Sequence, residues 1–368
     1  MHFLIFSGAN ERAILAACNS LAAENIGFSI IARPRNDPIA KSRLGRFVAA
    51  VRQSDALDIN DLVRTIQAVR SSLPARLLYL PTSEALNRLV LQHRDQLGEE
   101  CGLEIPMPAQ QTYETLSDKS TFNALAQRFG IVLPPPVDDA EASPLPLVAK
   151  PRHEFSPQTG EKLYPELLFT EAQRRAFLDG RTGHSYFYQR YLDGASHYYL
   201  FFFDGHGRHA ALYQQNLAQQ PNGKSIVAAQ SCVCPDSDFM EKVTACIGST
   251  GFVGFCMVEA MTVAGTSYLI ELNPRLWGPL SLALRCGFRI SWLGNPSAMV
   301  APAQPARPAR YAWLSGMWRS RRNGGALRWY PQGRAQFVRH LWSFLRGDIY
   351  LNSPRTWSMA LRELRARP

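Results

Sequence analysis

Two carboxylates and an amide stand at a hairpin-like spacing within the stretch 251–278. Glu259 lies in an apolar run, and Glu271 and Asn273 close a second run that is rich in β-branched and aromatic residues. A turn at Gly265 and Thr266 separates the two runs, so the stretch predicts two strands of a hairpin. Because side chains alternate along a strand, Glu271 and Asn273 share a face, and Glu259 is expected opposite them.

Carboxylate and amide oxygens are hard ligands that Mg²⁺ accepts, and a magnesium ion shared with phosphates needs only one or two carboxylates. Arg275 stands on the same predicted face, where a cation suits an anionic group in transfer. Solvated carboxylates at strand ends are the ordinary alternative. Both glutamates are embedded in apolar strands, however, where an unpaired charge is costly. The pattern therefore favours a metal or a cationic partner for Glu259 and Glu271.

This hairpin resembles the metal-binding hairpin of the ATP-grasp ligases, with Glu259 followed by the run Glu271-Leu272-Asn273-Pro274-Arg275. The continuation 276–279, with Gly287 after a short helix, is similar to the carbamoyl-phosphate-synthase-like branch of carboxylate–amine ligases. In that family the metal ligands would be Glu259, Glu271 and Asn273. Arg275 would be catalytic, beside the transferring phosphoryl group.

The resemblance also implies nucleotide contacts, which occur here in the family's order. Lys119 opens a predicted helix that runs to Arg128 and would reach the phosphates, and Lys150 ends the predicted strand 147–151 and would contact the α- and β-phosphates. The stretch 185–192 looks like the hinge between two lobes, although a plain aromatic core strand is the alternative. The implied adenine contacts are Gln189, Arg190, Leu192 and Met261.

Two further residues are candidates on the substrate side. Lys224 lies in the stretch 220–225, which looks like the family's substrate loop, and would stabilise an acyl phosphate; an ordinary exposed lysine is an equal alternative. Glu84 follows the predicted strand 76–80 and would face substrate, or else begins the next helix, where the helix dipole favours a carboxylate. The chain departs from many ATP-grasp enzymes at 152–165, where only Gly160 is available for a phosphate lid.

Composition bounds the class of protein. The 368 residues carry a net charge of +10, with 46% hydrophobic and 19% charged residues, which fits a soluble globular protein. No apolar run reaches the length of a membrane span, and the apolar N-terminus lacks the basic lead of a signal peptide. Seven scattered cysteines indicate reduced thiols, and a zinc site at Cys232 and Cys234 is disfavoured. We therefore expect a cytoplasmic protein.

The ends of the chain differ in character. A β-α-β pattern at 2–32 predicts a parallel sheet, and the turn at Gly8 lacks a complete dinucleotide-binding motif. The tail beyond 301 alternates tryptophan with arginine, and we expect a helical stretch at 337–345. Packing on the main body is the default for this tail, with a membrane-surface helix as the alternative. No nucleic-acid-binding motif accompanies the basic charge.

The predicted fold class is mixed α/β and α+β. It comprises a Rossmann-like pre-ATP-grasp domain at 1–108, two ATP-grasp lobes at 109–185 and 186–300, and a basic C-terminal extension at 301–368. The resemblance implies a ligase that activates a carboxylate as an acyl phosphate and joins it to an amine, such as an amino acid or peptide. ATP and Mg²⁺ are the implied cofactors, with two ions expected and Mn²⁺ as a substitute. Alternatives are a non-amine acceptor or a nucleotide-binding protein without turnover, and a homodimer is compatible with the resemblance.

Overall fold

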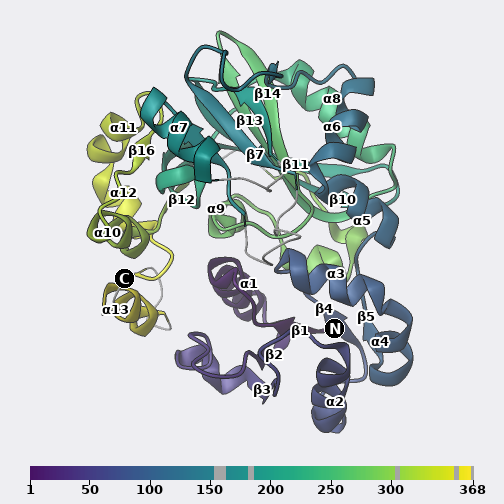
Figure 1. Ribbon diagram of the computed structural model, residues 1–368. Coiled ribbons are helices and arrows are strands. Elements are labelled where there is room, and N and C mark those ends of the chain that lie inside the picture. The colour runs from purple at the N-terminus through teal and green to yellow at the C-terminus, as the bar shows by residue number, and fades with distance from the viewer. Residues whose placement is uncertain (153–162, 181–185, 303–306, 352–355, 366–368) are drawn as a thin grey trace.

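The fold is a computed structural model that describes residues 1–152, 163–180, 186–302, 307–351 and 356–365. It contains three sheets, which have five, four and seven strands. Figure 1 shows the N-terminal unit at one end of the molecule, the four-stranded and seven-stranded sheets at the other, and the C-terminal helices along one side. The predicted phosphate lid falls largely on residues 153–162, outside the described residues.

The N-terminal unit is a parallel sheet with strand order β3-β2-β1-β4-β5. Its central strands β1 and β4 are almost wholly buried because helices cover both faces of the sheet, whereas the edge strand β3 is partly exposed. The β-α-β opening predicted for this unit is confirmed. Its elements are β1 (His2–Phe6), α1 (Glu11–Ala23), β2 (Gly27–Ala32), β3 (Val48–Val51), α2 (Ile59–Val69), β4 (Leu77–Tyr79), α3 (Glu84–Gln92), α4 (Arg94–Cys101) and β5 (Leu103–Glu104), with short 3₁₀ turns at Arg43–Phe47 and Arg70–Ser72.

The four-stranded sheet has the order β6-β9-β7-β8. Asp118 caps the helix that begins at Lys119, since its carboxylate accepts from the backbone N–H groups of Ser120 and Thr121, both at 2.9 Å. The predicted helix to Arg128 and the predicted strand at 147–151 have those bounds in the structure. The elements are α5 (Gln110–Ser117), α6 (Lys119–Arg128), β6 (Pro136–Val137), β7 (Leu147–Pro151), β8 (Glu166–Leu168), α7 (Glu171–Gly180) and β9 (Tyr186–Arg190).

The seven-stranded sheet is antiparallel, with the order β14-β13-β10-β11-β12-β15, and β16 pairs with β11. Its β10–β11 hairpin turns at Asp204, as the Asp-Gly-His-Gly sequence predicts. The buried Asp204 carboxylate accepts from the backbone N–H groups of His206 and Arg208 and from the Arg208 side chain. The elements are β10 (Ala195–Asp204), β11 (His209–Gln219), β12 (Ile226–Cys232), α8 (Ser237–Gly248), β13 (Val253–Val263), β14 (Thr266–Asn273) and α9 (Leu280–Arg285), with 3₁₀ turns at Pro221–Gly223, Ile290–Leu293 and Pro296–Ala298.

The C-terminal extension is built into this sheet. It supplies β15, which pairs with β12, and β16, which pairs with β11 (Figure 1). The single helix expected at 337–345 is two helices, because the backbone of His340 (φ −116°, ψ 27°) leaves the helical region. The elements are β15 (Arg310–Ala312), α10 (Leu314–Arg322), β16 (Arg328–Trp329), α11 (Gly333–Arg339), α12 (Leu341–Arg346) and α13 (Trp357–Arg365).

One contiguous apolar core joins the N-terminal unit, the seven-stranded sheet and the C-terminal extension. It includes Ile14 of α1, Leu200 of β10 and Tyr311 of the extension, all fully buried. All seven cysteines lie in the described part of the chain, and none of them forms a disulfide. None of the described helices has the length and apolar character needed to cross a bilayer.

Candidate active site

The predicted hairpin is formed by β13 and β14, and its two glutamates face each other. Glu259 pairs directly with Glu271 in the strand register, and a bulge follows between Glu259 and Ala260. The turn lies at Ala264 and Gly265, both with positive φ, one residue earlier than the sequence indicates. Glu259 is buried, with 8% of its surface exposed, whereas the Glu271 side chain is 33% exposed.

Asn273 and Arg275 extend this pair along one face of β14, as the alternation predicts. The Asn273 amide nitrogen donates to Glu271 Oε1 at 2.8 Å, and its amide oxygen accepts from Arg275 Nη2 at 3.0 Å. Arg275 Nη1 also donates to the Leu276 carbonyl at 3.1 Å. The guanidinium therefore uses both arms to hold the end of β14, and Asn273 links it to Glu271.

The two predicted phosphate lysines lie on the other side of the carboxylates. Lys119 Nζ is 4.0 Å from Glu271 Oε2, and Lys150 Nζ donates to the Ile270 carbonyl at 3.4 Å. Lys150 is buried because β7 carries it into the interior between β8 and β9. Lys119 from the start of α6 and Lys150 from β7 thus lie beside the two carboxylates of the β13–β14 hairpin.

The titration of these groups reflects burial and crowding. Burial, and then the repulsion of Lys119, lowers the pKa of Lys150 to about 8. Burial, and then the neighbouring Glu271, raises the pKa of Glu259 well above its ordinary value. Burial alone would also raise the pKa of Glu271, but Lys119 and the hydrogen bond from Asn273 outweigh it and lower the pKa. When no metal ion is bound, the two carboxylates therefore tend to share one proton, which Glu259 carries.

A chain of buried polar side chains supports Glu259 from behind. Ser196 Oγ donates to Glu259 Oε1 at 3.3 Å, Asn216 donates to Ser196 at 2.8 Å, and Gln214 donates to Asn216 at 2.7 Å. The sequence analysis did not identify these residues. Polar residues at alternate positions of an otherwise apolar strand, as at Gln214 and Asn216, are the signal that was available.

A cavity of about 130 Å³ brings most of the predicted residues together. Its lining comes from the four-stranded sheet, from the β13–β14 hairpin and from the extension. Eight predicted site residues line it: Lys119, Lys150, Gln189, Arg190, Leu192, Glu259, Met261 and Glu271. The structure thus assembles in one place residues that are up to 152 positions apart in the sequence.

No family model and no curated protein sequence matches this chain. Solved structures do. N5-carboxyaminoimidazole synthetase from Staphylococcus aureus, complexed with ADP, is 14% identical with a TM-score of 0.60, over 88% of this chain and 85% of that one. The corresponding synthetase from Thermus thermophilus is 15% identical with a TM-score of 0.57, over 83% and 80%. Biotin carboxylase from Campylobacter jejuni, solved as a β-γ-ATP complex, is 13% identical with a TM-score of 0.60, over 82% and 72%.

This chain has the ATP-grasp fold. The predicted fold class is thereby confirmed. Residues of both the four-stranded and the seven-stranded sheet line the cavity, which lies between them, and the predicted division into two lobes stays a prediction.

The C-terminal extension adds two residues to the ATP-grasp cleft that the sequence did not indicate. Arg328 and Tyr330 line the cavity beside β11. The Arg328 guanidinium lies over the rings of Tyr191, at 5.0 Å, and Tyr330, at 4.8 Å. The Tyr330 hydroxyl donates to Gln219 at 2.6 Å. Arg328 is thereby a fixed positive group in the cleft, close to the predicted hinge.

Four predicted residues lie outside the lining of this cavity: Lys224, Glu84, Asn273 and Arg275. The Lys224 ammonium is 5.4 Å from the centre of the Tyr164 ring, and the neighbouring Gly223 lines the cavity. Glu84 is the first residue of α3 and pairs with Arg88 at 3.0 Å. The substrate roles of Lys224 and Glu84 stay predictions.

The acidic face of the hairpin fits a magnesium ion chemically. Two facing carboxylates, one of them with a raised pKa, form a negative pair that a divalent cation would stabilise. The Asn273 oxygen, which accepts one hydrogen bond from Arg275, keeps a second lone pair. Among the described residues no group of three His, Cys, Asp or Glu side chains offers a metal site, so an all-protein cage is not found there. The two carboxylates, Glu259 and Glu271, are instead suited to a magnesium ion whose remaining ligands are phosphate oxygens.

Proposed function

We propose that the protein is an ATP-dependent ligase that activates a carboxylate as an acyl phosphate and joins it to an amine. The carboxylate oxygen bonds to the γ-phosphorus as ADP leaves. The amine nitrogen then bonds to the acyl carbon, phosphate leaves, and the nitrogen loses a proton. The observation that carries this proposal is the meeting of Lys119 and Lys150 with the facing Glu259 and Glu271 in one interlobe cavity.

Each group of the site has a proposed role, and all of those named here except Arg275 line the cavity. Lys119 and Lys150 would bind the nucleotide phosphates, and the hinge residues with Met261 would contact adenine. Arg275 would stabilise charge on the transferring phosphoryl group. Preorganised donors of this kind act on charge that develops during the reaction and need no rearrangement.

Mg²⁺, held by Glu259, Glu271 and Asn273, would supply charge neutralisation at the phosphates. The buried polar chain through Ser196 would keep the Glu259 carboxylate oriented for this task. A second ion and the use of Mn²⁺ belong to the same proposal. ATP as a cosubstrate fits the expected cytoplasmic location.

The cavity is smaller than the several hundred Å³ that a drug-sized ligand occupies. A whole nucleotide therefore requires the two lobes to separate further than they do in this structure. Lys150 on one lobe and Glu259 on the other would then close on the phosphates, which would exclude water from the acyl phosphate.

The test is release of ADP in the presence of Mg²⁺ with a panel of acids and amines, together with the mass of the product. Turnover is expected only when both partners are present. Glu271→Gln is nearly isosteric and should abolish turnover without unfolding the protein, whereas Glu241→Gln on the exposed side of α8 should retain it. Normal activity of the Glu271 variant at low magnesium would contradict the metal assignment.

Bicarbonate belongs in the panel as a second candidate acid. A 2-oxoglutarate carboxylase domain, 13% identical with a TM-score of 0.58, was solved with ADP and bicarbonate. ADP release with bicarbonate and an amine would make the reaction a carboxylation. ADP release without any amine would indicate a different acceptor, and nucleotide binding without release under all conditions would indicate a binding protein.

A further inference from the structure

The positive charge of this protein is concentrated in its C-terminal extension. Residues 301–368 contain thirteen arginines and two carboxylates, so their net charge of +11 exceeds the +10 of the whole chain. The rest of the chain is close to neutral. Positive charge confined to one end favours a large anionic partner over a general solubility effect.

The two carboxylates of the extension do not neutralise its surface. Asp348 is buried and accepts from the backbone N–H groups of Leu314, Tyr350 and Leu351. Glu363 accepts from the Trp313 indole and from the hydroxyls of two neighbouring side chains. Both carboxylates therefore stabilise the fold of the extension, and the arginines outside keep their charge.

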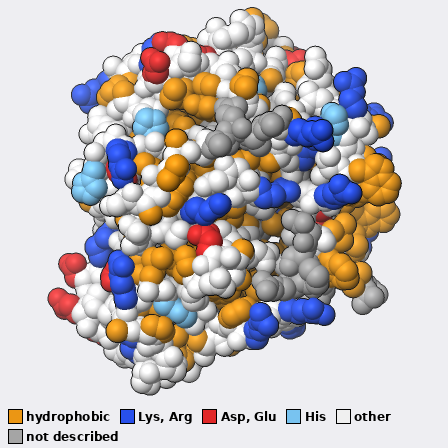
Figure 2. All heavy atoms as spheres, turned by 180° about the vertical axis from the view of Figure 1, so that it is seen from behind, with side chains coloured by type: hydrophobic (Ala, Val, Ile, Leu, Met, Phe, Trp, Pro, Cys, Tyr) orange, Lys and Arg blue, Asp and Glu red, His pale blue; other side chains and the backbone are white. Residues whose placement is uncertain are grey.

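Large apolar side chains are exposed among these arginines. Trp342 is 78% exposed, Val338 66% and Trp318 56%, and Leu341 is also exposed. On the outer face of α13, which packs against α10, Trp357, Leu361 and Leu364 are exposed at helical spacing. Figure 2 shows hydrophobic side chains gathered at the right edge of the molecule, where the extension lies, with Lys and Arg side chains nearby.

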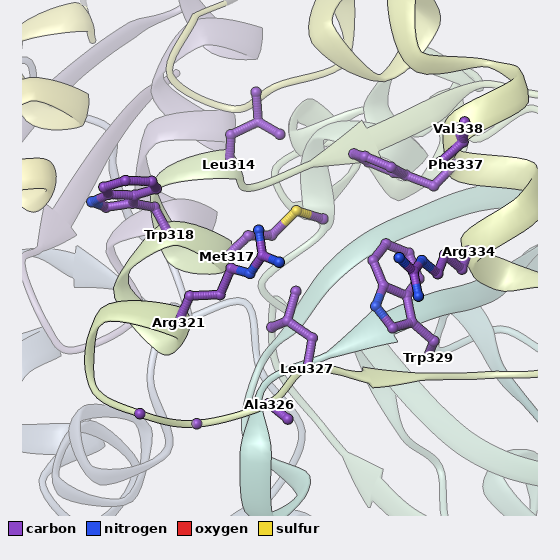
Figure 3. A pocket seen from close by; sticks show the side chains of 12 residues that line it. Leu314, Met317, Trp318, Arg321, Ala326, Leu327, Trp329, Arg334, Phe337 and Val338 are labelled. Atoms are coloured by element: carbon purple, nitrogen blue, oxygen red, sulfur yellow. The ribbon is translucent and has the colours of Figure 1, made fainter.

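A hollow of about 770 Å³ opens within this surface between α10, β16 and α11. Figure 3 shows Met317 and Leu327 lying between Arg321 on one side and Arg334 on the other. No carboxylate lines the hollow, and within the described part of the chain neither guanidinium has an ion pair or hydrogen bond. We define the basic apolar face as this hollow, whose lining includes Trp318, Arg321, Arg334 and Val338, together with the exposed Leu341 and Trp342 beside it.

We propose that the basic apolar face docks on an anionic lipid membrane. Arginines would contact lipid phosphates, while tryptophan and aliphatic side chains enter the interface, where amphipathic aromatic rings are favoured. A second copy of the chain is disfavoured as the occupant, because a symmetric contact through this face would bring like charges together. Single-stranded nucleic acid would use the arginines and tryptophans but has no use for the exposed Val338 and Leu341. This proposal is independent of the proposed chemistry.

The test is flotation of the full chain with vesicles of phosphatidylcholine alone or mixed with phosphatidylglycerol. We expect binding to the anionic vesicles only, weakened by salt, with a blue shift of tryptophan emission. Each basic residue near the surface is worth about five-fold, so Arg321→Gln with Arg334→Gln should weaken binding by about twenty- to thirty-fold. Trp342→Ala should weaken binding by about ten-fold.

The matched control is Arg64→Gln with Arg128→Gln, which makes the same change in net charge at exposed positions of α2 and α6. It should leave vesicle binding within about two-fold of the parent protein. Equal losses in the two pairs, equal binding to neutral and anionic vesicles, or binding without a blue shift would overturn the proposal. The proposal would also be overturned if the protein bound a single-stranded oligonucleotide but did not bind the vesicles. Unchanged thermal midpoints would exclude unfolding as the cause of any loss.

Discussion

Glu259 is buried, and it faces Glu271, which is partly exposed. Lys119, at 4.0 Å from Glu271, and the amide of Asn273 stabilise one carboxylate, and the raised pKa of the other follows from burial and then from the nearby Glu271. A buried carboxylate beside a second one is expensive unless a cation completes the pair. At the scale of single residues, this incomplete charge balance is the strongest sign of a binding site in the molecule.

Arg275 should distinguish a ligase from a nucleotide-binding protein. Its two arms hold Asn273 and the Leu276 carbonyl, which a lysine cannot do at once. We predict that Arg275→Lys keeps near-normal ATP affinity while ligation falls by about 10²-fold, which is typical of losing one preorganised donor. Calorimetric ATP titration and the rate of ADP release measure the two quantities. A drop of equal size in both would make Arg275 a ground-state binding residue.

Ser196 is a positioning residue for Glu259. Ser196→Ala removes its hydrogen bond to the carboxylate and leaves Asn216 without that acceptor. Because groups behind a metal ligand tune metal affinity, we expect the magnesium concentration for half-maximal rate to rise by about ten-fold. The control is Ser231→Ala, another buried serine, whose hydroxyl accepts from the Ala309 backbone. A shift in magnesium dependence of the same size in both variants would contradict the role.

Site residues that belong to a local sequence pattern could be predicted well. The hairpin spacing predicted that Glu259 lies opposite Glu271. The expectation that Lys119 belongs to the same site came from the family resemblance, and its Nζ lies 4.0 Å from Glu271. Ser196 and Asn216 could not be identified, because their importance arises only when β10 lies between β11 and β13. Arg328 was missed for the same reason, since its pairing with β11 spans more than a hundred residues.

Among the elements, the β10–β11 hairpin depends on one buried carboxylate. Burial raises the pKa of Asp204, but the hydrogen bonds from His206 and Arg208 outweigh it and hold the pKa below its ordinary value. A carboxylate whose pKa is lowered by folding stabilises above its unfolded pKa of about 3.8, and that stabilisation is lost as pH falls through the folded value.

We therefore predict that Asp204→Asn destabilises the protein by about 1–3 kcal/mol at pH 7, and that the difference from the parent shrinks below about pH 4. Urea unfolding of both proteins at several pH values measures this difference. A penalty that stays constant down to pH 3 would mean that shape, and not charge, holds the turn.

Elements with strong local signals were predicted closely, and elements defined by tertiary pairing were not. The strand at 2–6 and the helix at 119–128 have the expected bounds, because apolar runs and caps mark them. The two-residue strands β5 and β16 carry too few residues for any periodicity. The break between α11 and α12 at His340 could not be predicted, because no proline or glycine marks it in the sequence.

At the scale of the whole molecule, Arg12 ties three parts of the chain together. It lies 4.0 Å over the Trp313 ring and donates to Ile226, Ser225 and Tyr311 at 2.8–3.0 Å. The N-terminal unit, the seven-stranded sheet and the extension therefore meet at one guanidinium.

Arg12→Lys keeps the charge but loses the planar stack and most of these hydrogen bonds. We predict a loss of about 2–3 kcal/mol in the free energy of unfolding, with earlier proteolysis of the extension. Urea unfolding and limited proteolysis measure the two effects. Arg64→Lys, at an exposed position of α2, is the control and should behave as the parent protein. Unchanged stability in the Arg12 variant would show that the three parts hold together without it.

Strand β16 has two faces with different tasks. Arg328 and Tyr330 line the interlobe cavity, while Leu327 and Trp329 line the hollow in the basic apolar face. If docking at this surface displaces Trp329, we expect the adjacent Arg328 of this two-residue strand to move with it. Occupancy of the surface and occupancy of the cleft would then be linked energetically, and such linkage is reciprocal. If vesicles tighten nucleotide binding by some factor, nucleotide must tighten vesicle binding by that same factor, and the protein would become a coincidence detector for the two.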